Sequence, residues 1–283
     1  MAAGMNTYSD ISAYVNTIFE DAMFIARDNS LMQPLVRTFN DTQGMALRKN
    51  SQYGTASITQ VAETDDLVSQ TFNPSVIATL TPAEYAGQVF ITDLRMESDP
   101  FGARDDAAVE LGVAMAQSIE HNILSTFTSL TGGTVGAAGS LLTWGYFSAA
   151  MTLLRNQNAP LPYAAVLSPN MYHNLAKSAT VAGATSSAAP NFADDVTRRW
   201  WVNSFGPVDI YLSSNIAAGT AVYGAMFSRQ AIAYDERRAP RLEPQRDASR
   251  RGLELNMSTV YGYGVWRPRF GVTIVADGSA PTT

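Results

Sequence analysis

The clearest periodic pattern in the sequence is a stripe of apolar residues between positions 108 and 127. Apolar side chains recur at steps of three and four residues, at Ala108, Leu111, Met115, Ile119, Ile123 and Phe127. This spacing predicts one long amphipathic helix. Asp99-Pro100 supplies a start signal, and Asp105 and Asp106 lie near the positive end of the helix dipole. At 1.5 Å per residue, a helix of about 20 to 25 residues would extend roughly 30–37 Å.

Four further segments are predicted to be helical. Ser9–Arg27 carries an apolar stripe behind two capping residues, and Trp144–Gln157 places apolar side chains on one face. Ser168-Pro169 supplies a cap and a first-turn proline for a helix that continues through Lys177. A short helix is expected over Asp194–Asn203.

Alternating or β-rich runs predict the strands. They lie at Thr55–Ala62, Gln88–Arg95, Tyr163–Leu167, Val208–Leu212, Ala221–Phe227, Gln230–Tyr234, Gly252–Tyr263 and Val265–Ala276. Gly132–Ser140 is expected to be a flexible connector. Helices and strands are segregated rather than regularly alternating, which indicates an α+β fold.

The first two predicted strands flank a polar stretch, Glu63–Gly87, which is interrupted by Pro74 and Pro82. This arrangement predicts a long hairpin that projects from the body of the protein. Because an isolated hairpin is only marginally stable in water, we expect it to contact another subunit.

Composition narrows the function classes. Only 16% of the 283 residues are charged and 46% are hydrophobic, against about 25% charged in soluble domains. A chain with few charges is a candidate for burying surface against partners. The net charge of −6 argues against a dedicated nucleic-acid binder.

Candidate chemistry is sparse. The chain has no cysteine and two histidines, His121 and His173, far apart in sequence, which argues against disulfides, cysteine nucleophiles and a common zinc site. There is no phosphate-binding loop, nucleophile elbow or paired-carboxylate motif. No apolar run approaches the roughly 20 residues of a membrane span, and no signal-peptide pattern is present. We therefore expect no catalytic, cofactor or metal site.

Four local phrases, in this order, carry a family resemblance. They are ARDDAAVELGVAMAQSIEHNIL at 103–124, AAVLSPNMYHNLAKS at 164–178, GAMFSRQAIAYDER at 224–237 and YGYGVWRPRFGVTIVAD at 261–277. The collinear set resembles the major capsid proteins of tailed bacteriophages, whose fold is shared with herpesvirus shells and encapsulins.

The resemblance implies an organisation of the chain. The implied parts are an N-terminal arm at 1–50, an extended β-hairpin loop at 51–95, a peripheral domain with a spine helix at 96–131 and 250–277, an axial domain at 132–249 and a C-terminal tail at 278–283.

The implied function is structural: pentamers and hexamers of the chain form the icosahedral head that encloses double-stranded DNA, assembled in the cytoplasm of a bacterial host. The implied partners are further copies of the chain, scaffolding, portal and decoration proteins, and weakly contacted packaged DNA, with no membrane. No scaffolding segment is visible ahead of the arm, so we expect a separate scaffolding protein. Two alternatives are an encapsulin-like compartment and, from a different class, a soluble α+β enzyme.

An arginine-rich stretch supplies most of the candidate interface residues. It contains seven of the seventeen arginines among four carboxylates: Arg229, Arg237, Arg238, Arg241, Arg246, Arg250 and Arg251 with Asp235, Glu236, Glu243 and Asp247. Arginine pairs bidentately with carboxylates, so we expect ion pairs between subunits. A solvated charged surface is an equal alternative. Contact with DNA is a third, which the mixed signs argue against.

Two residues of the predicted loop region, Arg48 and Lys49, are candidates to reach a carboxylate of a neighbouring subunit. One branch of the resembled family joins a lysine here to an asparagine of another subunit, with a glutamate as base. Asn256 and Glu254 are conceivable counterparts here, although no local motif supports that link.

Overall fold

The computed structural model describes residues 31–41, 44–52, 74–98, 102–183 and 204–281, with isolated positions between 53 and 73. The helices expected over Ser9–Arg27 and Asp194–Asn203, and most of the strand expected over Thr55–Ala62, lie outside the described residues.

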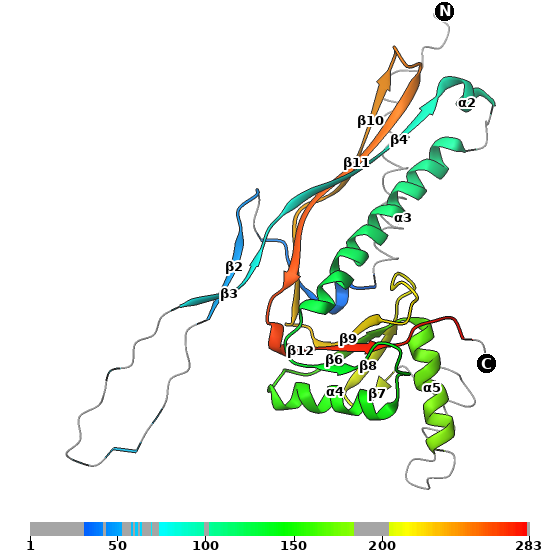
Figure 1. Ribbon diagram of the computed structural model, residues 1–283. Helices are drawn as coiled ribbons and strands as arrows, with labels where there is room; N and C mark the ends of the chain where they lie inside the picture. Colours follow the sequence, from blue (N-terminus) through cyan, green and yellow to red (C-terminus); the bar gives the residue numbers. More distant parts are fainter. Residues whose placement is uncertain are drawn as a thin grey trace, which may run out of the picture.

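One half of the fold is an elongated sheet with a long helix along it (Figure 1). The strand order is β1 (Arg37–Phe39), β10 (Ile232–Asp247), β11 (Gly252–Val265) and β4 (Ala83–Thr92). β10, β11 and β4 are antiparallel, whereas β1 runs parallel to β10. The short helix α2 (Asp93–Ser98) follows β4 and leads towards α3 (Ala103–Leu124).

α3 is the predicted long helix, and the apolar stripe is the face that it buries. Its 22 residues correspond to a length of roughly 33 Å. All six stripe residues named above are buried, and α3 packs against β4 and β11. The stripe continues into a 3-10 helix, η2 (Ser125–Ser129), where Phe127 packs on Phe227 with ring centroids 5.8 Å apart. The predicted spine helix is therefore confirmed.

The other half is a six-stranded sheet. Its order is β5 (Thr134–Gly136), β12 (Gly271–Ala276), β9 (Val222–Ser228), β6 (Tyr163–Leu167), β8 (Val208–Leu212) and β7 (Ser204–Phe205). Every residue of β12 is buried, which is typical of a central strand covered on both faces. The helix α4 (Trp144–Asn156) packs against β5, β9 and β12, and η2 contacts β9 and β12.

The helix α5 (Pro169–Gly183) begins where the sequence predicted. The Met171 amide donates to Ser168 Oγ at 3.2 Å, which satisfies one of the first-turn N–H groups. α4, β6 and β8 also match their predicted ranges to within one residue.

The projecting hairpin is formed by β2 (Arg48–Gln52) and β3 (Ser75–Leu80), which pair antiparallel as a separate two-stranded sheet (Figure 1). The prediction that Gln88–Arg95 forms its second strand is wrong. Residues 83–92 form β4 in the body of the protein, where β4 pairs with β11 along its whole length.

Three other expectations about elements also need correction. Gly132–Ser140 contains strand β5, parallel to β12, so it is not simply a flexible connector. The predicted strand Gln230–Tyr234 is in part a turn, and its residues from Ile232 onward begin the 16-residue strand β10 of the elongated sheet. Val265–Ala276 divides into the end of β11, a 3-10 helix η3 (Pro268–Phe270) and β12, which crosses to the six-stranded sheet.

Candidate functional site

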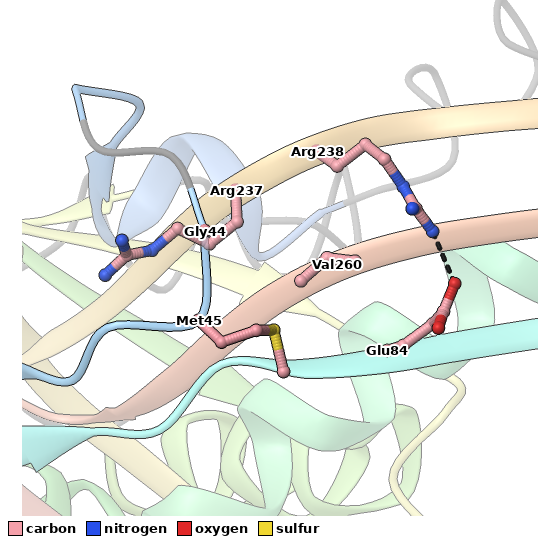
Figure 2. A pocket seen from close by; sticks show the side chains of 6 residues that line it. All are labelled: Gly44, Met45, Glu84, Arg237, Arg238 and Val260. Atoms are coloured by element: carbon pink, nitrogen blue, oxygen red, sulfur yellow. Dashed lines mark hydrogen bonds and ion pairs between the residues drawn. The ribbon is translucent and has the colours of Figure 1, made fainter.

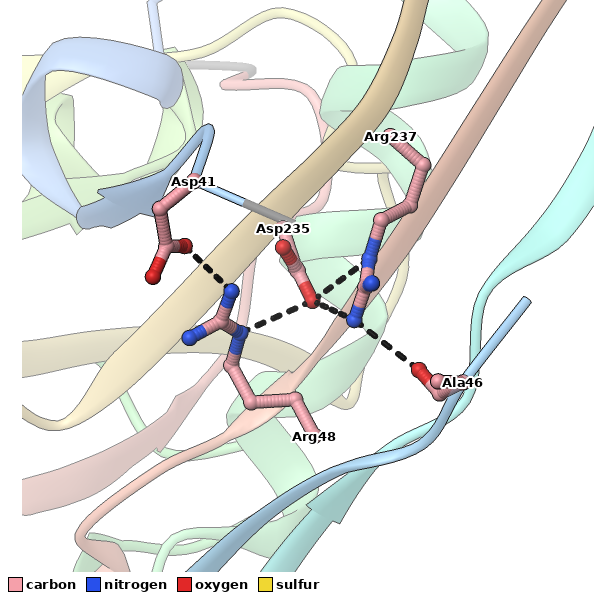
Figure 3. A network of polar contacts seen from close by, with 5 residues as sticks. All are labelled: Asp41, Ala46, Arg48, Asp235 and Arg237. Atoms are coloured by element: carbon pink, nitrogen blue, oxygen red, sulfur yellow. Dashed lines mark hydrogen bonds and ion pairs between the residues drawn. The ribbon is translucent and has the colours of Figure 1, made fainter. Parts of the chain in front are cut away.

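The centre of the candidate site is Asp235 in β10, whose side chain is 0% exposed. Its Oδ2 accepts hydrogen bonds from Arg48 Nε at 3.0 Å and from Arg237 Nε and Nη2 at 3.0 and 2.6 Å (Figure 3). Arg48 also pairs with Asp41, and Arg237 Nη2 donates to the Ala46 carbonyl at 2.9 Å. Two guanidinium groups therefore join β10 to the segment that leads into the hairpin.

These charges are held in a largely buried environment. The Arg237 side chain is only 2% exposed. Burial alone would lower the pKa of Arg48, but the hydrogen bonds to Asp235 and Asp41 outweigh it and raise that pKa. Two buried atoms, Asp235 Oδ1 and Arg237 Nη1, have no hydrogen-bond partner among the described residues. Because breaking a buried ion pair leaves an uncompensated charge, the network is sensitive to the loss of any member.

A small apolar cluster lies beside this network at the base of the hairpin. Phe39 packs on Trp266 with ring centroids 5.1 Å apart, and the Arg48 guanidinium lies over Phe39 at 4.3 Å. Asn50 Nδ2 donates to the Trp266 carbonyl at 2.8 Å, and Leu80 is fully buried in the same cluster. The base of the hairpin is therefore supported by its own chain. Contact of the rest of the hairpin with another subunit stays a prediction.

A groove with a volume of about 600 Å³ borders the network at Arg237. Its lining is Gly44, Met45, Glu84, Arg237, Arg238 and Val260 (Figure 2). Arg238 Nη2 donates to Glu84 Oε1 at 2.5 Å and to Ser258 Oγ at 3.1 Å. Arg238 therefore links β10 across β11 to β4, which reinforces the sheet.

Towards the β10–β11 turn, the remaining ion pairs are more exposed. Arg246 binds both carboxylate oxygens of Asp93, with N–O distances of 3.2 and 2.9 Å. Two further pairs are Arg241–Glu243 at 3.2 Å and Arg250–Glu254 at 3.3 Å. Such exposed pairs contribute at most about 1 kcal/mol each.

The turn itself is closed by Asp247. Its Oδ1 accepts hydrogen bonds from the Ser249 hydroxyl and amide and from the Arg250 amide. The hydroxyl of Ser249, and then the Arg250 amide, hold the pKa of Asp247 below its usual value. Asp247 therefore has a local role in the turn, whatever else it contacts.

The structure brings only some of the predicted interface residues together. Arg48, Asp235 and Arg237 form one cluster, whereas Lys49 is exposed in β2, Arg251 lies in the β10–β11 turn, and Glu236 is half-buried opposite Tyr261. The ion pairs described above are all formed within one chain. Contact of these residues with a neighbouring subunit, and a covalent link through Lys49, stay predictions.

Sequence reasoning missed three acidic partners. Glu84 lies 154 residues from Arg238, and Asp93 lies 153 residues from Arg246. Asp41 lies only seven residues from its partner Arg48. Sequence reasoning also missed Glu120, a buried residue of α3 that accepts a hydrogen bond from Ser213 Oγ at 2.5 Å. The sequence did contain a weak signal for Glu120, since it lies four residues after Ala116 and four before Leu124, on an apolar side of the helix.

None of the helices in the described ranges is long and apolar enough to cross a membrane. Within the same ranges, no three His, Asp or Glu side chains are grouped so as to hold a metal ion.

Comparison with known proteins agrees with this architecture. The structure of Mycobacterium phage Che8 is similar with a TM-score of 0.69 at 16% identity, over 82% of this chain and 85% of that one. The cyanophage Pam1 capsid gives 0.67 at 10% identity, over 88% and 92%. A virus-like particle from Pyrococcus furiosus gives 0.60 at 11% identity, over 92% and 99%. These likenesses establish the tailed-phage major capsid fold.

No curated protein matches the sequence. A family model described as phage capsid protein, however, matches residues 76–274, a span that runs from the hairpin strand β3 into β12. With this match over most of the chain, and with the fold in agreement, the protein belongs to the phage capsid protein family, as a major capsid protein of tailed-phage type.

Proposed function

We propose that copies of this chain form hexamers and pentamers that close into an icosahedral phage head around double-stranded DNA. In this proposal the subunit is structural and has no catalytic activity. The family match and the capsid fold support a structural role in the virion head. A closed shell built from one chain requires edges that self-associate, because closure is reached only when every edge is matched.

The observation that carries the proposal is the projecting hairpin with apolar side chains in solvent. Met45, Leu47 and Val76, which lie beside or within β2 and β3, are 59%, 52% and 53% exposed. Val76 lies opposite Ser51, four residues along the strand from Leu47, so the exposed apolar groups are spread along the protruding element. Large exposed apolar side chains on one protruding element are typical of interaction sites. Because the base of the hairpin is held by Asp235 and its arginines, the exposed part is presented in a defined direction.

The proposed domain division is modified by the strand pairing. We propose a peripheral domain that contains α3, β4, β10 and β11, and an axial domain that contains the six-stranded sheet with β12. The arm and the hairpin stay as separate parts. Scaffolding, portal and decoration proteins are proposed partners in the head, with assembly in the bacterial cytoplasm.

Assembly is tested by sedimentation velocity and negative-stain electron microscopy of the purified chain. We expect capsomers, tubes or shells. The triple variant M45S/L47S/V76S should remain folded and monomeric, whereas M45L/L47M/V76I keeps the apolar character and should assemble. A wild-type chain that sediments only as a compact monomer, or a serine variant that assembles normally, would contradict the proposal.

A second candidate is a compartment of the encapsulin kind, because the fold is similar to that of a virus-like particle from Pyrococcus furiosus as well as to phage capsids. Such a shell would enclose a cargo protein instead of DNA. The contents of native particles separate the two: nuclease-protected DNA supports the phage head, and a stoichiometric second protein supports the compartment.

A further inference from the structure

Four arginines gather where the two sheets meet: Arg37, Arg229, Arg267 and Arg269, called here the junction arginines. Three backbone segments that contact one another carry them. Arg229 Nε donates to the Val36 carbonyl at 3.3 Å, beside Arg37. The Arg267 amide donates to the Ala231 carbonyl at 3.0 Å, two residues from Arg229. Arg269 follows in η3.

The junction arginines differ from the arginines farther along β10 in having no carboxylate partner. All four are exposed, and no ion pair joins them to a carboxylate in the described part of the chain. The segments that carry them, 36–40, 228–234 and 264–271, contain no aspartate or glutamate. The next acidic residue along β10 is Asp235, which Arg48 and Arg237 already neutralise. This makes a local cationic surface on a chain with a net charge of −6.

Three of the four guanidinium groups are held by contacts that leave N–H groups available. Arg37 lies over the Phe39 ring at 4.7 Å, and Arg267 lies over the Phe270 ring at 5.6 Å. Stacking occupies one face of the guanidinium plane, while its donors point outward within that plane. Arg229 uses only Nε for the Val36 carbonyl. The side chains are therefore partly ordered before any ligand arrives, which lowers the entropic cost of binding.

We propose that the junction arginines bind the phosphodiester backbone of nucleic acid. This inference rests on the proposed enclosure of DNA and identifies the surface of the subunit that faces it. Phosphate accepts the bidentate guanidinium fork, and backbone contacts carry no base specificity. The binding is weak, salt-dependent and indifferent to sequence. Of the arginine-rich stretch 229–251, only Arg229 takes part.

The test measures anisotropy of a short labelled DNA duplex of random sequence, titrated with the full-length chain at a series of salt concentrations. Each phosphate contact contributes about 0.9 to the slope of log K against log salt, so four contacts give a slope of about −3.6. R267Q/R269Q should reduce the magnitude of the slope by about 1.8. The control R95Q/R155Q removes the same charge from two exposed arginines in α2 and α4, and should leave the slope unchanged.

The quadruple variant R37Q/R229Q/R267Q/R269Q should lose nearly all salt-dependent binding. An unchanged slope in this variant, or an equal loss in the control, overturns the inference. Loss of particle assembly without a change in slope also overturns it, because the junction would then bind an acidic surface of another subunit. Particle imaging is scored separately: a wild-type chain that binds DNA through these arginines but builds no particles refutes the proposed head and leaves the phosphate site standing.

Discussion

Replacing Asp235 with asparagine tests whether the buried ion pairs hold the hairpin on the body. The substitution keeps the shape of the side chain but removes the charge that Arg48 and Arg237 share. Since the Arg237 side chain is 2% exposed, its guanidinium cannot turn to bulk water without local opening. Removing one partner of a buried pair costs about 3–5 kcal/mol. The exposed pair Arg241–Glu243, with side chains 49% and 58% exposed, is worth at most about 1 kcal/mol.

Hydrogen exchange of backbone amides is the suitable assay, because the expected effect is local. In D235N the amides of β2 and β3 should lose protection by about two to three and a half orders of magnitude, since about 1.4 kcal/mol corresponds to a factor of ten. Protection in α4 and β6 should not change. R241Q should leave β2 and β3 as they are in the wild type.

A double variant, D235L/R237M, separates charge from packing. It removes the uncompensated guanidinium of Arg237 together with its partner, and replacing a buried pair by apolar groups is often neutral. It should therefore recover part of the protection lost in D235N. Unchanged protection of β2 in D235N would refute the reasoning, and would assign the anchoring to the Phe39–Trp266 cluster instead.

Three further predictions concern the body of the protein. S213A removes the donor to the buried carboxylate of Glu120 and should lower stability by about 1–3 kcal/mol in thermal unfolding; an unchanged melting curve would contradict this. G136A places a Cβ 2.1 Å from a carbonyl oxygen of β12 at a φ of +86°, and should cost at least about 3 kcal/mol in denaturant unfolding. G139A, at a φ of +75° with open space, should cost only about 1–2 kcal/mol. Burial, and then Tyr263, raise the pKa of Tyr85 from 10.0 to about 12. The neutral Tyr85 hydroxyl therefore contributes fully to stability below pH 10, and this contribution is lost as pH rises towards 12. In Y85F, phenolate absorbance should lack one late-titrating component, and stability should fall less between pH 10 and pH 12 than in the wild type.

The sequence predicted the helices of the described body well because their signals are local. The stripe from Ala108 to Phe127 is a repeat within one segment, and the Ser168-Pro169 cap acts within a single turn. Both signals predict the same local structure regardless of how the rest of the chain folds. The long helix and the start of α5 therefore appear where the sequence placed them.

The strand partners could not be read in the same way. β4 alternates like a hairpin strand, yet it pairs with β11 because Val89 lies opposite Leu255 under α3. No feature within residues 83–92 indicates that β4 pairs with β11 instead of with a hairpin strand. Gly132 and Gly136 looked like flexible positions, but a Cβ at either one would lie 2.5 Å or less from a backbone oxygen in the segment that includes β12. Close approach of a neighbouring backbone, rather than flexibility, accounts for them.

The residue types of the candidate site could be predicted from the sequence, but the pairing between individual residues could not. Seven arginines among four carboxylates indicate ion pairs, without saying which ones. Arg48 reaches Asp235 across 187 positions, and Arg238 reaches Glu84 across 154. The division into paired and unpaired arginines depends on these long-range contacts, so Arg229 could not be grouped with Arg267 from the sequence.

The outer edge of β10 limits how subunits can join. Beyond its short pairing with β1, which ends opposite Asp235, β10 has no second strand neighbour among the described residues. Pro240 and Pro244 remove two backbone donors from that stretch, and an edge interrupted in this way resists extension by another strand. Growth of a continuous sheet from one molecule to the next is therefore blocked here. Association along this border must use side chains, whose contacts can slide and re-form, so the same border can meet its neighbour at more than one angle.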